Sequence, residues 1–177
     1  MASPLAHVLV GVGSAAAVAH ATGIPPSLTL WVGAIISSGL PDLDFAVKVL
    51  GLSRRSFHRH ATHSLVVLAA FIVVVVALWW MFVGNVDTNL VLAWSAALFS
   101  HPVLDAITTD AVLGARGAGI PLFWPILSQR WFLQSPIPTL NVFACRSLRE
   151  AYKGLLWENA FFGVVTFVLV LLCYVSR

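Results

Sequence analysis

One uncharged stretch, residues 64–83, restricts the fold of this chain more than any other feature. It reads SLVVLAAFIVVVVALWWMFV, about as long as a helix must be to cross the hydrocarbon core of a bilayer. Of the 177 residues, 59% are hydrophobic and 10% are charged, whereas a soluble domain carries about 25% charged residues. The sequence therefore predicts a membrane protein and excludes an ordinary soluble enzyme, a disordered chain and a disulfide-rich secreted module.

The other apolar stretches complete a predicted helical bundle. We expect an all-α fold, a polytopic membrane bundle that forms a single domain over residues 1–177. The first stretch is interpreted as a retained helix rather than a signal peptide, because it lacks a basic leader and contains His7 and His20. The predicted spans are residues 5–22, 28–41, 64–83, 89–109 and 155–175.

The basic residues predict how the bundle is oriented. Nine of the ten Lys and Arg side chains fall within residues 45–62 and 111–154. The positive-inside rule places both stretches in the cytoplasm, with a cytoplasmic N-terminus and Arg177 as the one exception. This orientation explains the net charge of +3 without a nucleic-acid partner. Residues 114–140 are rich in proline, glycine and aromatic side chains and are predicted to form an interfacial or re-entrant segment.

Ionisable side chains from four segments fall at one predicted membrane depth, near the cytoplasmic surface. A single such residue could be satisfied by water or lipid headgroups. Four segments that converge on one layer instead indicate a functional site, because ionisable groups inside a bilayer are costly. His20 is placed towards the opposite surface. The converging residues are His7, Asp42, Asp44, His58, His60, His63, His101 and Asp105.

These residue types suit a metal ion. His101 and Asp105 are four residues apart, so they share one face of a helix. Asp42 and Asp44 follow Pro41, where an extended or turning backbone could direct both carboxylates to one centre. Mixed nitrogen and oxygen ligands suit zinc, manganese or iron, and the number of candidates suggests two ions. The simpler interpretations are that Asp42 and Asp44 only end a helix at the membrane surface, and that His101 and Asp105 only form an intrahelical hydrogen bond.

The residues around His63 suit an anionic substrate. Thr62 and Ser64 flank this histidine, and either could cap the following helix. The N-terminal amides of a helix bind phosphate well. Arg59 could bind a phosphate through two hydrogen bonds, or could only anchor the loop on the cytoplasmic side.

The order of these residues resembles that of a known family. The motifs are a histidine in a small-residue helix (His7), L-P-D-L-D at 40–44, H-R-x-x-T-H-S at 58–64, H-P-x-L-D-x-x-T at 101–108, and G-x-x-x-x-x-P at 119–125. This series resembles the YdjM-type inner-membrane metal-dependent hydrolases. That family is in turn similar to zinc-dependent phospholipase C and the S1/P1 nucleases, which are helical enzymes that cleave phosphoesters. His60 stands where members usually have glycine, so it is not assigned as a ligand.

The resemblance and the residue pattern together assign roles. Either Asp42 or Asp44 would serve as general base and Arg59 would bind phosphate, so these three are the predicted catalytic residues. The predicted metal ligands are His7, Asp42, Asp44, His63, His101 and Asp105. The predicted substrate-binding residues are His58, Arg59, Thr62 and Ser64, and Thr108 and Thr109 are predicted to orient the ligands.

The predicted function is metal-dependent hydrolysis of a phosphoester. Metal-activated water would attack a lipid-like, phosphate-containing substrate at the cytoplasmic headgroup level of a bacterial-type inner membrane. Two divalent ions, zinc before manganese or iron, are expected. The first alternative is a metal-ion or proton-coupled transporter, which would need polar residues through the whole bilayer. The second is a structural membrane protein that binds no metal.

Overall fold

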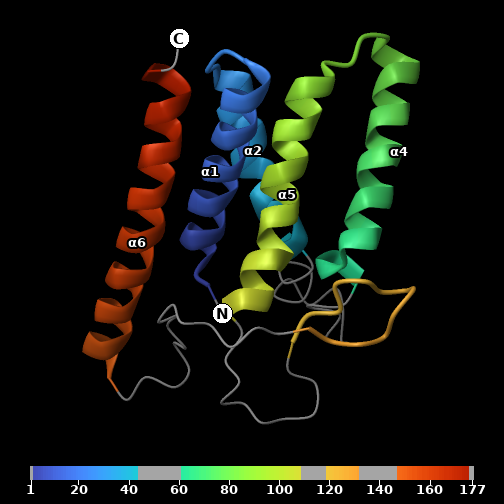
Figure 1. The fold of residues 1–177 in the computed structure, drawn as a ribbon. Coiled ribbons are helices and arrows are strands. Elements are labelled where there is room, and N and C mark those ends of the chain that lie inside the picture. Colours follow the sequence, from blue (N-terminus) through green and yellow to red (C-terminus); the bar gives the residue numbers. More distant parts are fainter. Residues whose placement is uncertain (1, 44–60, 109–118, 132–146, 176–177) are drawn as a thin grey trace.

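The computed structural model describes residues 2–43, 61–108, 119–131 and 147–175 of the chain. Within these ranges the regular structure is helical, and the long helices lie side by side (Figure 1). They are α1 (Pro4–Thr22), α2 (Leu28–Gly39), α4 (Leu65–Val83), α5 (Thr88–Thr108) and α6 (Leu148–Val175), with two short 3-10 helices, η1 (Leu40–Asp42) and η2 (Ala61–His63). The predicted all-α membrane bundle is confirmed.

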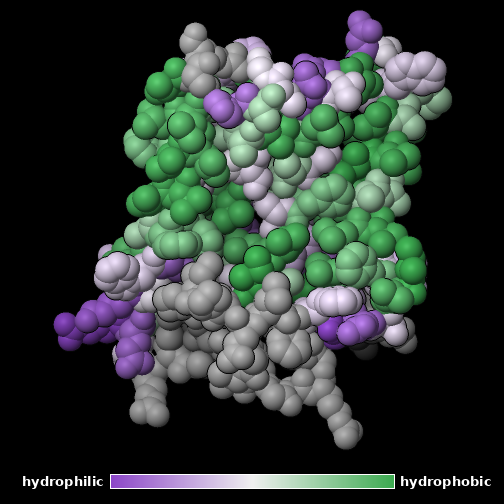
Figure 2. Space-filling model, viewed as in Figure 1, coloured by the Kyte–Doolittle hydropathy of each residue, from purple (hydrophilic) through white to green (hydrophobic). Residues whose placement is uncertain are grey.

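Four of the described helices, α1, α4, α5 and α6, are long and apolar enough to cross a membrane. Figure 2 shows hydrophobic side chains in a broad band across the visible face, with hydrophilic residues above and below it. Large apolar side chains such as Trp80 and Phe82 of α4 and Phe167 of α6 stay exposed on the bundle. Such an outer surface is unfavourable in water and suits contact with lipid chains.

Helix α2 is shorter than the span predicted at residues 28–41. Its 12 residues rise about 18 Å, which is less than the hydrocarbon thickness of about 30 Å. The chain then tightens into η1, which contains Pro41. Proline cannot donate the hydrogen bond that would continue an α-helix, so the helix ends here and Asp42 turns into the bundle.

The helices begin where polar side chains cap their first turns. The side-chain oxygens that accept these backbone N–H groups belong to Ser3, Ser27, Ser64, Asp87 and Ser147. Of the two caps considered for the helix after His63, the structure uses Ser64. These caps replace part of the hydrogen bonding that a helix end lacks.

Helix α1 packs against α2, α5 and α6. Small residues on its buried side, including Gly11 and Ala15, allow the helices to approach closely. A Cβ atom added at Gly11 would overlap the Ser38 side chain, and one added at Gly33 would overlap the Trp94 ring. The close approach therefore depends on glycine at these two positions.

Residues 119–131 form a turn-rich segment beside the start of α4, drawn in orange in Figure 1. Its carbonyl groups hold that helix end: Leu122 accepts the Leu65 amide at 2.8 Å, and Trp124 accepts the Ser64 hydroxyl. Within the segment predicted at 114–140, the described residues 119–131 contain no helix that could span the bilayer, in agreement with their proline content. Its predicted interfacial or re-entrant position stays a prediction.

Candidate metal centre

Five ionisable side chains from four segments meet at one end of the bundle. We call this group the His/Asp centre. The three histidines and Asp105 are buried, and the side chain of Asp42 is 34% exposed. The structure thus brings together five of the six residues predicted to bind metal. The group consists of His7 of α1, Asp42 of η1, His63 of η2, and His101 and Asp105 of α5.

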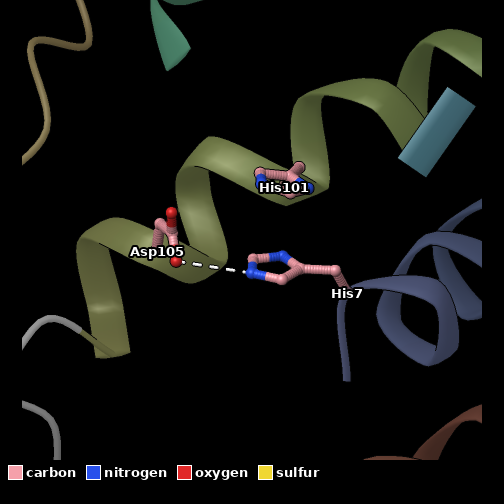
Figure 3. Close-up of side chains that lie close together, drawn as sticks. All are labelled: His7, His101 and Asp105. Atoms are coloured by element: carbon pink, nitrogen blue, oxygen red, sulfur yellow. Dashed lines mark ion pairs between the residues drawn. The ribbon is translucent and has the colours of Figure 1, made fainter. Parts of the chain in front are cut away.

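Asp105 lies between two histidines. Its Oδ1 atom is 3.4 Å from His7 Nε2, and its Oδ2 atom is 3.4 Å from His63 Nε2. Figure 3 shows how His101 and Asp105 project from the same side of α5, with His7 reaching them from α1. The i, i+4 spacing noted in the sequence places this pair on one helix face, as expected.

Asp42 also contacts two histidines, His101 and His63. Its Oδ1 atom is 3.4 Å from His101 Nε2 and 3.7 Å from His63 Nε2. These distances, like those of Asp105, exceed the usual length of an N–H···O hydrogen bond, about 2.7–3.2 Å. Two ligand atoms each about 2.1 Å from a tetrahedral zinc ion lie about 3.4 Å apart. The spacing therefore fits ligand atoms arranged around an ion better than direct hydrogen bonds.

The orientation of His101 favours metal binding. Its Nδ1 atom is 2.7 Å from the carbonyl oxygen of Ser38. A carbonyl oxygen only accepts hydrogen bonds, so Nδ1 carries the proton and a neutral ring has its lone pair on Nε2, facing Asp42. Histidines that bind metals are commonly held in this way by a carbonyl or carboxylate.

His7 stacks on His101, with ring centroids 3.7 Å apart and planes 13° from parallel. Two positively charged imidazoles at this distance would repel each other, so the arrangement disfavours protonation of both rings at once. The Nδ1 atom of His7 is buried and hydrogen-bonds to no residue in the described part of the chain. Neutral imidazoles and ionised carboxylates are the forms in which these side chains bind metal.

Asp42 provides an ionised carboxylate at the edge of the centre. Burial acts to raise its pKa, but contact with His101 and the attraction that the histidines exert in their protonated form outweigh that effect and hold the pKa below its ordinary value. The carboxylate is therefore charged at neutral pH.

The donor set could hold one or two ions. Two triads lie close enough for metal binding, and His101 belongs to both. Since its Nδ1 atom is hydrogen-bonded to Ser38, His101 has one nitrogen for one ion. A second ion therefore depends on a bridging carboxylate. Asp105 suits that role, because its two oxygens face different histidines. The triads are His7, His101 and Asp105, and Asp42, His63 and His101.

Three further predicted residues have visible structural contacts. The Ser64 hydroxyl caps α4 and donates to the carbonyl of Trp124, and the Leu65 amide is taken by Leu122. Two of the groups expected to bind phosphate are therefore already used within the protein. Thr108 accepts the Ala2 amide at 3.0 Å, and Thr62 Oγ1 is 3.0 Å from His63 Nδ1. Asp44, His58, Arg59 and Thr109 lie outside the described residues.

Two contributors were not predicted from the sequence. Ser38 acts through its backbone carbonyl, which no residue type reveals. Glu158 of α6 is buried and accepts the Ser3 amide at 2.6 Å, and Ser3 caps the helix that carries His7. The sequence shows an acidic residue, Glu158, within the apolar stretch at 155–175, which is unusual in a membrane helix. No sequence pattern indicated which group it contacts.

The fold and the site together define a polytopic helical membrane protein with a buried His/Asp cluster like those that bind metals. The chain belongs to the YdjM inner membrane protein family, whose model matches residues 1–177. No curated protein and no solved structure matches the chain. The family resemblance inferred from the motifs is thereby confirmed over the whole sequence.

Proposed function

We propose that this protein is a membrane-embedded, metal-dependent hydrolase that cleaves a phosphoester of a lipid or similar amphiphile. The observation that carries the proposal is the spacing within the His/Asp centre. Each carboxylate contacts two imidazoles at 3.4–3.7 Å, and the group is buried where uncompensated charge is costly.

The distances suggest how the ligands divide between two ions. Asp42, His63 and His101 would hold the first ion together with one oxygen of Asp105. His7 and the other oxygen of Asp105 would begin the second site, which Asp44 would complete. Zinc is the preferred ion, because imidazole and carboxylate ligands at this spacing suit tetrahedral coordination.

The chemistry follows from the exposure of the ligands. A bound divalent ion lowers the pKa of a water ligand towards about 7. Asp42 is the partly exposed member of the centre, so its ionised carboxylate is placed to accept a proton from an entering water. The Ser38 carbonyl holds His101 in one tautomer. The lone pair on Nε2 of His101 would therefore stay directed at the His/Asp centre while Asp42 accepts the proton.

The substrate would approach from the headgroup layer on the cytoplasmic side. Arg59 and His58 lie two and three residues before η2 in the sequence, and we assign them to the phosphate group. Thr62 would orient His63, whose Nδ1 atom lies 3.0 Å from its hydroxyl. The N-terminus would face the cytoplasm of the inner membrane, since the basic stretches mark that side.

Metal analysis of detergent-purified protein at neutral pH tests the proposal. We expect at least one zinc, manganese or iron ion per chain in the wild type, and loss of this metal in His101→Ala and Asp105→Ala. His20→Ala is the matched control, because His20 lies on α1 but at the end away from the centre. Wild-type protein without stoichiometric metal would contradict the metalloenzyme hypothesis.

A second measurement separates hydrolysis from transport. The wild type should release phosphate from at least one member of a panel of phospholipids and isoprenoid phosphates. Metal uptake into proteoliposomes without any phosphate release would favour the transporter. A transporter needs polar groups across the bilayer, and α4 has no charged residue along its length.

A further inference from the structure

A groove of about 440 Å³ lies between α2, α4 and α5. Its volume falls within the range of about 300–1,000 Å³ that is usual for pockets that bind small molecules. Helix α4 forms one wall from Phe71 to Trp79, and α5 forms another from Leu90 to Leu98. In each wall the lining residues are spaced i, i+1, i+4, i+5 and i+8, so each helix contributes one continuous face.

The walls of the groove are apolar even where they contain tryptophan. The Trp79 indole N–H donates to the Asn85 carbonyl at 3.1 Å, and the Trp94 indole N–H donates to the Leu30 carbonyl at 3.3 Å. Both rings can therefore offer carbon surface to the groove. A ligand that fills this space must itself be apolar over most of its length.

One end of the groove is lined by residues that lie about one helical turn from ligands of the His/Asp centre. Leu98 lines the groove and lies three residues, about one helical turn, before His101. Leu40 also lines it and lies two residues before Asp42. The opposite end is marked by the α4–α5 connection, where Asp87 contributes a polar group. An elongated molecule could thus lie along the groove with one end at the metal centre.

We propose that the groove binds the hydrocarbon chain of the substrate while the phosphate headgroup lies at the His/Asp centre. The proposal rests on the hydrolase function and narrows its substrate to amphiphiles with a long hydrocarbon chain. A helix of a second protein chain, about 10 Å across, is too thick for a groove of this volume. A lipid tail is thin and apolar, and the groove lies among helices that face lipid.

The test is photolabelling with hexadecyl phosphate that carries a diazirine in the middle of its chain. Val76→Trp places an indole in the groove, and Val74→Trp places the same indole on α4 away from the lining residues. In the wild type we expect mass spectrometry to find labels on the groove faces of α4 and α5. Val76→Trp should reduce these labels about tenfold, because the indole occupies the space of the chain, and Val74→Trp should not.

Labelling is measured with and without a metal chelator, so that its outcome does not depend on catalysis. Equal labelling of the two variants would overturn the assignment of the groove. In a kinetic arm, Val76→Trp should raise KM for hexadecyl phosphate and leave butyl phosphate hydrolysis unchanged. An equal effect on both substrates would also contradict the proposal. Failure of the wild type to hydrolyse either compound would instead contradict the hydrolase function and leave the labelling result to decide the groove.

Discussion

At the scale of single residues, backbone groups prepare the His/Asp centre for an ion. The Ser38 carbonyl selects the tautomer of His101, and the stacking of His7 on that ring disfavours two protonated imidazoles. The carboxylate of Asp42 is ionised because the surrounding histidines lower its pKa. As the pH falls, protons therefore compete with the metal for the imidazoles at a higher pH than for this carboxylate.

The first prediction concerns this competition. As the pH falls from 7.5 to 5, we expect bound metal to be lost progressively, since protons compete with the metal for the imidazoles and protonated imidazole cannot bind metal. Because its folded-state pKa is lowered, Asp42 should stay ionised over this interval, and its stabilising effect should disappear only below about pH 4. Metal content after equilibrium dialysis measures the profile.

Asp42→Asn is the control for the pH profile. It should lower metal content throughout the interval because it removes a ligand, while metal loss on acidification should persist because the three histidines are still present. Retention of all metal down to pH 5 would contradict histidine ligation.

The second prediction concerns Glu158 of α6, whose carboxylate accepts a hydrogen bond from Ser3 at the start of α1. Glu158→Ala leaves the partly buried Ser3 amide without this 2.6 Å acceptor and should cost about 1–3 kcal/mol. Glu158→Gln keeps an acceptor oxygen and should cost less. Glu150→Ala, on the exposed first turn of α6, is the matched control. Thermal unfolding, followed by tryptophan fluorescence, ranks the variants by stability. Equal melting temperatures for the two Glu158 variants would contradict the role of this hydrogen bond.

At the scale of elements, the length of α2 determines where Asp42 lies. From the end of the bundle where α1 leads into α2, a helix of 12 residues descends about 18 Å. His101 lies 13 residues beyond the start of α5, a rise of about 20 Å. The two residues thus reach one depth from the same end of the bundle, and a full-length span in place of α2 would carry Asp42 past the site.

The third prediction tests the packing that places these elements. Gly11→Ala introduces a methyl group that overlaps Ser38, so it should destabilise the protein by about 1–3 kcal/mol and shift the carbonyl that orients His101. Gly163→Ala is the matched control, because a Cβ there meets no atom within 4 Å in the structure; it should be neutral or stabilising. Unfolding temperature and metal content are measured for both. Unchanged metal content in Gly11→Ala would show that this contact does not position the centre.

At the scale of the whole molecule, the centre lies at one end of the bundle and the α4–α5 connection lies at the other (Figure 1). Helix α1 joins α2, α5 and α6, whereas α4 packs more lightly, on α5. The arrangement leaves the groove open beside α4 while α1 holds the ligands of the centre in a packed core.

The fourth prediction concerns orientation in the inner membrane. In a background without Cys145 and Cys173, Asn85→Cys should react with a membrane-impermeant maleimide from the periplasmic side. Ser147→Cys should react only after the cells are opened, because the adjacent basic stretch is predicted to be cytoplasmic. The opposite labelling pattern would place the His/Asp centre on the outer side and overturn the proposed access from cytoplasmic headgroups.

The sequence alone determined the class of fold and the identity of most candidate ligands. Apolar stretches as long as a bilayer is thick leave few alternatives to membrane helices. The i, i+4 spacing of His101 and Asp105 follows from helix geometry, and the motif order indicated the family. Helix ends were predicted within a few residues, except that α6 begins at Leu148 rather than at residue 155. The mixed polar and apolar residues before position 155 concealed that start.

Only the tertiary structure decided which atoms meet. The contact of the Ser38 carbonyl with His101, the Glu158 contact and the groove between α2, α4 and α5 depend on how the helices pack, and no local sequence pattern encodes those distances. The role of Ser64 was also decided in this way, since the carbonyl that receives its hydroxyl comes from Trp124, 60 residues along the chain. A sequence shows which side chains can bind a metal or line a wall, but the packing of small residues sets the spacing at which they do so.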